Sequence, residues 1–111
     1  MVYRANEEEV DFYVNGQLFE TIVQQLNVTN GQIVLGGSTD LGLGVFHDGN
    51  IDDISVWNIA LTQSEIEQYM NCPPTGDEAG LIGYWNFEEG SGTTALDLTA
   101  NGNNGTINGA T

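Results

Sequence analysis

The chain has 111 residues, 40% of them hydrophobic, which is enough for one domain of ordinary size with its own core. Sixteen acidic residues face a single basic residue, Arg4, and the resulting net charge of −15 at pH 7 argues against binding to nucleic acid or anionic membranes. No run of 18 apolar residues indicates a membrane span, and the sequence carries no recognisable signal peptide.

Fifteen glycines and many Asn, Thr, Val and Ile residues favour closely spaced strands and tight turns, so the predicted class is all-β. The first predicted element is a hairpin over residues 9–24. Val10, Phe12 and Val14 alternate with more polar residues there, and Asn15-Gly16 is the preferred pair for a two-residue turn.

Further strands are predicted over residues 32–35 and 51–57. The Gly- and Asp-rich stretch 38–50 between them is expected to be a loop with a short strand at 45–46. A single short helix is predicted over residues 61–70, because Thr62 and Glu65 have the spacing of a capping box before apolar residues at helical intervals.

The Pro- and Gly-containing segment 73–80 reads as a connector, and residues 81–87 as a strand. The Asn- and Gly-rich tail after residue 100 has the composition of a disordered segment, but a loop that wraps a cation has the same composition. Cys72 has no partner for an internal disulfide and is expected to be a small buried residue.

Two segments resemble the laminin-G-like jelly-roll domains of large secreted and cell-surface proteins. The sequences GNIDDISVWN at 49–58 and ALTQSEI at 60–66 are similar to the end of such a domain, and GLIGYWNFEEGSGTT at 80–94 with GNNGT at 102–106 is similar to its beginning. The resemblance implies an antiparallel, concanavalin A-like jelly-roll β-sandwich, incomplete and in permuted order. Residues 1–72 would be its C-terminal half, 73–80 the connector, and 81–111 its N-terminal strands.

A partial sandwich leaves open strand edges and uncovered apolar faces, which drive association. We therefore expect a homodimer in which two chains complete each other's sheets, or a single sandwich if the two pieces pack within one chain. The same resemblance implies an extracellular or cell-surface location.

Within the predicted strand 51–57, alternation groups Asp52 with Ile54 and Val56 and so directs it inward, where a carboxylate needs a cation or several hydrogen-bond donors. The family resemblance implies Ca²⁺ at this place, and oxygen-only ligands in a Gly-rich loop also favour calcium over zinc or magnesium. The ligands that the resemblance implies are Asp52, Asp97, Asn101, Gly102 and Asn104. The alternative is that Asp52 caps a loop and Asp97 forms an Asx-turn.

Catalysis is not expected. Glu9 and Asp11 resemble two positions of the Glu-x-Asp-x-x-Glu motif of jelly-roll glycoside hydrolases, but Val14 stands at the third position. A lone loop histidine, His47, has no nucleophile beside it in sequence.

The expected function is a non-catalytic adhesion module that binds a glycan or an extracellular protein, and the alternative is a structural spacer without a ligand. Candidate ligand contacts lie in the loop 38–50, namely Asp40, His47 and Asp48. The aromatic residues Tyr13, Trp57, Tyr84 and Trp85 are suited to stacking on sugars but are more typical of a core.

Overall fold

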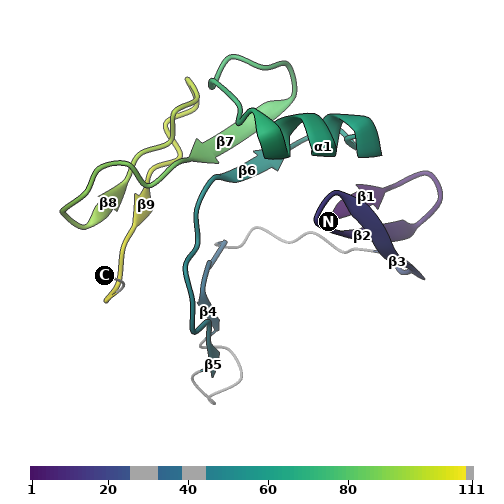
Figure 1. The fold of residues 1–111 in the computed structure, drawn as a ribbon, viewed down its shortest axis with the longest axis horizontal. Helices are drawn as coiled ribbons and strands as arrows, with labels where there is room; N and C mark the ends of the chain where they lie inside the picture. Colours follow the sequence, from purple (N-terminus) through teal and green to yellow (C-terminus); the bar gives the residue numbers. More distant parts are fainter. Residues whose placement is uncertain (26–32, 39–44, 110–111) are drawn as a thin grey trace.

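The computed structural model describes residues 1–25, 33–38 and 45–109, in which short antiparallel strands predominate (Figure 1). This confirms the predicted class, a mostly β chain with one short helix, consistent with part of a concanavalin A-like sandwich. In chain order the elements are β1 (Val2–Arg4), β2 (Glu9–Val14), β3 (Gln17–Val23), β4 (Gly37–Ser38), β5 (Val45–Phe46), β6 (Ile54–Trp57), α1 (Gln63–Asn71), β7 (Leu81–Trp85), β8 (Thr94–Ala95) and β9 (Gly105–Thr106).

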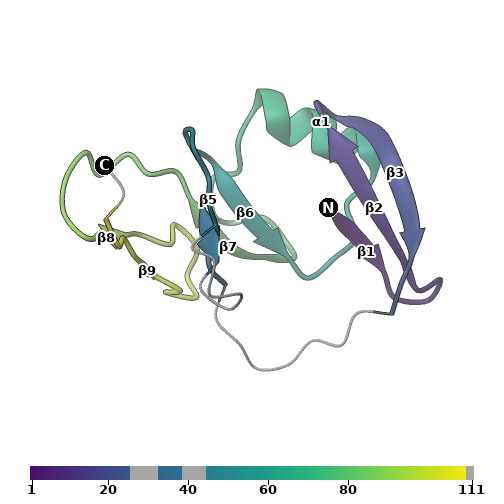
Figure 2. The same cartoon turned by 90° about the horizontal axis from the view of Figure 1, so that it is seen from below.

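The first three strands form one antiparallel sheet in the order β1–β2–β3 (Figure 2). The predicted hairpin is confirmed: Asn15 and Gly16 both have positive φ, 51° and 76°, as a type I′ turn requires. The predicted alternation is only partly correct, because Asp11 is buried beside Val10 while Val14 is exposed. Asp11 tolerates this position because it accepts hydrogen bonds from its neighbours across the sheet, as described below.

The second important pairing joins β6 to β7, which are separated by the helix and the connector. The predicted strand 51–57 begins only at Ile54, because Asp53 has a left-handed φ of 48° that interrupts the extended backbone. The inward orientation expected for Asp52 is therefore wrong, and Asp52 is exposed. β7 ends at Trp85 rather than at residue 87, where Phe87 also has a positive φ, 52°.

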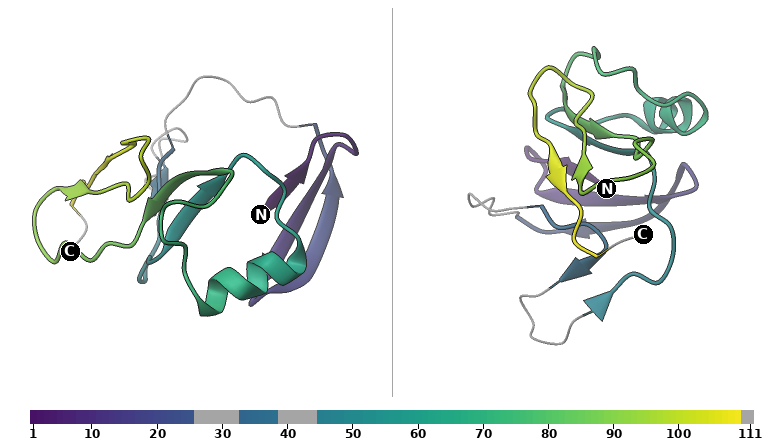
Figure 3. Two further views of the ribbon diagram at one scale, coloured as in Figure 1. Left: turned by 90° about the horizontal axis from the view of Figure 1, so that it is seen from above. Right: turned by 90° about the vertical axis from the view of Figure 1, so that its left-hand side faces the viewer.

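The helix α1 begins and ends within one or two residues of its prediction. Its capping box is present: the Thr62 hydroxyl accepts from the Glu65 N–H, and the Glu65 carboxylate accepts from the Thr62 N–H. The helix lies beside β6 (Figure 3). The Trp57 and Tyr69 rings pack between them with centroids 4.8 Å apart. Cys72 follows the last turn and is exposed, so its predicted burial is wrong.

Two small ribbons complete the described structure: β4 pairs with β5, and β8 pairs with β9. The short strand at 45–46 is confirmed. The strand predicted over 32–35 is not formed at residues 33–35, and residue 32 lies outside the described part of the chain. No described strand pairs with residues 33–35, and Ile33, Val34 and Leu35 have between 47% and 70% of their surface exposed.

The core is small relative to the apolar content of the chain. Among the described residues, the buried hydrophobic side chains are Val2, Val10, Leu81, Tyr84 and Ala95. Many larger apolar side chains remain exposed, including Phe19, Val23 and Phe46, each with more than 70% of its surface accessible. A monomer that leaves this much apolar surface in water gains little from burial, so this chain is suited to contact with another surface.

The connector packs on the C-terminal loop at Gly76, and we predict that this position does not tolerate a side chain. Gly76 has a φ of 111°, and a Cβ added there would lie 2.5 Å from the Leu98 carbonyl oxygen. Gly90 has a φ of 69° but open space around it, so it is a matched control. We expect Gly90→Ala to lower the free energy of unfolding by about 1 kcal/mol and Gly76→Ala by about 1–3 kcal/mol more, in urea titrations. Equal losses would contradict the packing of the connector against Leu98.

Candidate binding groove

A cavity of about 950 Å³ lies between the N-terminal sheet and the β6–α1 unit of the described structure, and we call it the groove. One wall comes from β1 and β2. The other wall comes from β6, from residues 58–61 that join β6 to the helix, and from α1 itself. The lining residues used below are Val2, Tyr3, Tyr13, Asp53, Ser55, Val56, Trp57, Ile66, Tyr69, Met70 and Pro74.

The walls of the groove are mainly apolar and aromatic. Trp57 and Tyr69 stack with an interplanar angle of 35°, and the Trp57 Nε1–H donates to the Ser55 Oγ at 2.9 Å, which fixes the indole. Tyr3 and Tyr13 line the opposite wall and are half-buried. An apolar cleft with a few fixed polar groups is the usual form of a ligand site in proteins.

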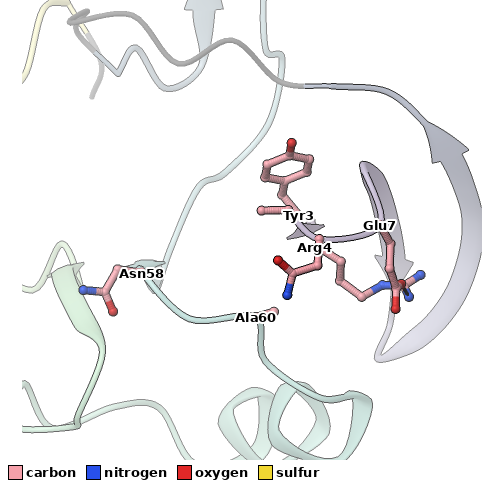
Figure 4. Close-up of a pocket in the computed structure, with 7 residues that line it drawn as sticks. Tyr3, Arg4, Glu7, Asn58 and Ala60 are labelled. Atoms are coloured by element: carbon pink, nitrogen blue, oxygen red, sulfur yellow. Dashed lines mark hydrogen bonds and ion pairs between the residues drawn. The ribbon is translucent and has the colours of Figure 1, made fainter.

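The only basic residue lies beside the groove, in a smaller pocket of about 360 Å³ that shares Tyr3 and Ala60 with it (Figure 4). Arg4 binds Asp11 through two hydrogen bonds, from Nε at 2.9 Å and from Nη2 at 3.2 Å, and also binds Glu7 and Glu9. The guanidinium, together with the Thr21 hydroxyl, holds the pKa of Asp11 below its usual value.

The C-terminal loop is organised around the buried carboxylate of Asp97. Its Oδ1 accepts from the N–H groups of Tyr84 and Thr99, and its Oδ2 accepts from the Thr99 hydroxyl and the Asn103 N–H, at distances of 2.8 to 3.1 Å. Burial by itself raises the pKa of Asp97, but these donors outweigh it and hold the pKa below its usual value. The Asp97 N–H in turn donates to the Asn104 side chain.

Tyr84 connects this loop to the groove. Its backbone N–H donates to Asp97, while its hydroxyl donates to the Asp53 Oδ1 at 2.6 Å. Burial of the ring, together with the Asp53 carboxylate, raises the pKa of Tyr84 to about 12, so the hydroxyl remains a donor across the physiological range. Tyr84 therefore links Asp53, just before β6, to Asp97 in the C-terminal loop, through its side chain and its backbone respectively.

Of the residues predicted to hold calcium, Asp97 and Asn104 are joined by a hydrogen bond, whereas Asp52 makes no hydrogen bond to either. Asp97 already accepts from four donors, which fills the acceptor positions of a carboxylate. Asp52 is exposed and accepts the N–H of Asp53. Asn101 donates its side-chain amide to the Ile82 carbonyl, while Gly102 and Asn104 are exposed. Among the described residues, no group of three or more His, Cys, Asp or Glu side chains has the geometry of a metal site. The predicted set has only two carboxylates, Asp52 and Asp97, and calcium binding stays a prediction.

Of the predicted ligand contacts in the loop 38–50, His47 and Asp48 do not line the groove. Asp40 lies outside the described residues. His47 and Asp48 are exposed and follow β5. Their role in ligand binding stays a prediction.

Sequence reasoning missed two features of the site. The Arg4 cluster was not predicted because its members come from different strands. A single Arg among sixteen carboxylates is nevertheless a signal that it binds several of them. The Tyr84 contact with Asp53 was missed because it depends on the β6–β7 register, which pairs Ser55 with Tyr84 across the connector.

The fold is that of a mostly β, antiparallel chain with one short helix. A family model described as the concanavalin A-like lectin/glucanases superfamily, of the laminin G type, matches residues 1–67. The chain belongs to this superfamily. The match does not reach residues 81–111, so their likeness to the start of such a domain stays a prediction. Comparison with curated proteins and comparison with solved structures each gave no match.

Membership of the laminin G type indicates a binding or adhesion module, a kind of domain that is typically extracellular and generally non-catalytic. The described part of the chain contains no helix with the length and apolar content needed to cross a bilayer.

We predict that the Asp97 carboxylate stabilises the fold and that an asparagine side chain cannot take its place. Asp97→Asn places an N–H₂ group against N–H donors, so we expect a loss of about 2–4 kcal/mol in the free energy of unfolding at pH 7. Asp48→Asn, which alters an exposed carboxylate, is the control and should change stability by less than about 0.5 kcal/mol.

The stability of wild type and of Asp97→Asn is also expected to depend differently on pH. Because the folded pKa of Asp97 lies below its unfolded value of about 3.9, its stabilisation is complete above that unfolded value and is lost as the pH falls through the folded one. The stability difference between wild type and Asp97→Asn should therefore shrink below about pH 4. A difference that stays constant down to pH 2 would show that Asp97 is not held as an anion.

Proposed function

We propose that this chain is a non-catalytic extracellular binding module and that the groove is its ligand site. The observation that carries the proposal is the apolar and aromatic lining of the 950 Å³ groove in a protein of the concanavalin A-like superfamily. The exposed apolar surface elsewhere on the described chain also supports a role in contact rather than in chemistry.

The positions of Glu9 and Asp11 support the non-catalytic part of the proposal. An acid/base pair of a glycoside hydrolase needs one carboxyl group to be protonated near neutral pH and both to reach the substrate. Here both carboxylates bind Arg4, and the side chain of Asp11 is only 7% exposed. The pair therefore acts as an ion cluster that secures β1 to β2.

The proposed ligand is a carbohydrate or an extracellular protein, and binding arrays with groove variants test this. Tyr13→Ala removes an aromatic ring from the groove wall, whereas Phe19→Ala removes an exposed ring on β3 that does not line it. We expect wild type and Phe19→Ala to bind the same glycans or peptides saturably, and Tyr13→Ala to bind at least about fivefold more weakly, as for loss of one contact in a ligand site. Binding that is equal in all three proteins would place the site elsewhere, and no saturable binding would favour the spacer role.

Calcium stabilisation is retained as a separate prediction. It is supported by the net charge of −15, by the exposed carboxylate of Asp52, and by the family resemblance. We expect millimolar calcium, added after chelation, to raise the melting temperature more than NaCl of equal ionic strength does, and Asp52→Asn to reduce the rise. No excess rise over NaCl would contradict calcium binding.

We also propose that the chain forms a homodimer through its open strand edges. β3 is the outer strand of the N-terminal sheet and carries the exposed Leu18 and Phe19, and no described strand pairs with its other edge. Self-association opposes two charges of −15, so screening strengthens it. We expect light scattering to show twice the monomer mass, with the dimer fraction rising from 50 to 500 mM NaCl. A monomer at micromolar concentration in both buffers would contradict the dimer.

A further inference from the structure

We propose that the occupant of the groove is a segment of a partner protein in which basic side chains alternate with apolar ones. The inference rests on the proposed function, because it names the ligand class of the same groove. It is carried by three properties of the described residues: the charge around the groove, the state of its polar groups, and its aromatic faces.

The net charge of the described side chains around the groove is negative, and the one Lys or Arg side chain of the sequence is already paired. Arg4, the single basic residue, is bound to three carboxylates beside the groove. Asp53 lies in the lining, and Glu67 lies at the rim, where its side chain approaches Gly16 and accepts from the Gln17 amide. Net negative charge at a cleft with apolar walls raises the local concentration of cationic ligands.

Two polar side chains of the groove, those of Asp53 and Ser55, already bind within the chain, which leaves fewer groups for the hydroxyls of a sugar. A bound sugar needs several free donors and acceptors that converge on its hydroxyls. The Asp53 Oδ1 accepts from the Tyr84 hydroxyl, and the Ser55 Oγ accepts from the Trp57 indole. The lining of the groove also contains Val2, Val56, Ile66, Met70 and Pro74. These residues form apolar surface that suits apolar side chains of a ligand.

Aromatic faces supply the third property. Trp57, Tyr69, Tyr3 and Tyr13 line the groove from both walls. A lysine or arginine side chain lays its aliphatic stem along apolar surface and its charged end over an aromatic ring, where cation–π attraction adds to the negative field. An occupant with alternating basic and apolar residues therefore satisfies the rings, the apolar wall and the charge at the same time.

The test uses three synthetic ten-residue peptides with a fluorescent label: alternating lysine and leucine, alternating lysine and serine, and alternating glutamate and leucine. Fluorescence anisotropy is measured with the wild-type chain at 50 and 500 mM NaCl. We expect saturable binding of the lysine–leucine peptide only, with an affinity at least about tenfold weaker at high salt because the charges are screened.

Two variants of equal net charge test the groove itself. Tyr13→Leu keeps apolar bulk but removes a ring, and we expect it to weaken binding of the lysine–leucine peptide about two- to thirtyfold. Phe19→Leu makes the same change outside the groove and should leave the affinity unchanged.

Each other outcome contradicts the inference in a distinguishable way. Equal binding of the lysine–serine peptide, or binding insensitive to Tyr13→Leu, would mean that only the net charge of the chain attracts the peptide, and this would overturn the proposal. Binding of no peptide would overturn it as well. In that case groove-dependent binding on a glycan array would leave the proposed binding function in place, and a negative glycan array would remove both.

Discussion

The structure depends on one electrostatic constraint: sixteen carboxylates must be accommodated with a single cation in the sequence. The chain meets it mainly with hydrogen-bond donors. Asp97 accepts from four donors, Asp53 from a tyrosine hydroxyl, and Glu78 from the N–H groups of Thr75 and Gly76, which hold the pKa of Glu78 below its usual value. Because hydrogen bonds to a charged acceptor are stronger than neutral ones, these carboxylates can act as the organising centres of loops.

Arg4 plays the complementary part in the N-terminal sheet. Its side chain allows Asp11 to be buried on β2, because a guanidinium matches both oxygens of a carboxylate in a way that no other side chain does. Because Arg4 is bound in this cluster, the adjoining groove keeps apolar walls, aromatic rings and acidic surroundings. The binding properties proposed for the groove are thus a consequence of how the ionic interactions of the scaffold are distributed.

The arrangement also explains how the chain connects the segment matched to the superfamily with the segment beyond it. β6 belongs to the matched residues 1–67 and β7 to the rest, yet they pair directly, and Tyr84 contacts Asp53 on one side and Asp97 on the other. In the Asn- and Gly-rich tail, which composition alone could not distinguish from a disordered segment, the described residues 101–109 are held to the fold through the buried Asp97 carboxylate.

The sequence by itself determined the features that depend on neighbouring residues. The turn at Asn15-Gly16, the capping box between Thr62 and Glu65, and the all-β class all follow from local backbone preferences, which act over only a few residues. The laminin-G resemblance likewise rests on contiguous motifs. Only the tertiary structure decided the direction of Asp52, the partners of Arg4 and Asp97, and the existence of the groove. These depend on strand register and on the left-handed backbone at Asp53, which bring together residues that are far apart in the chain and that no local pattern encodes.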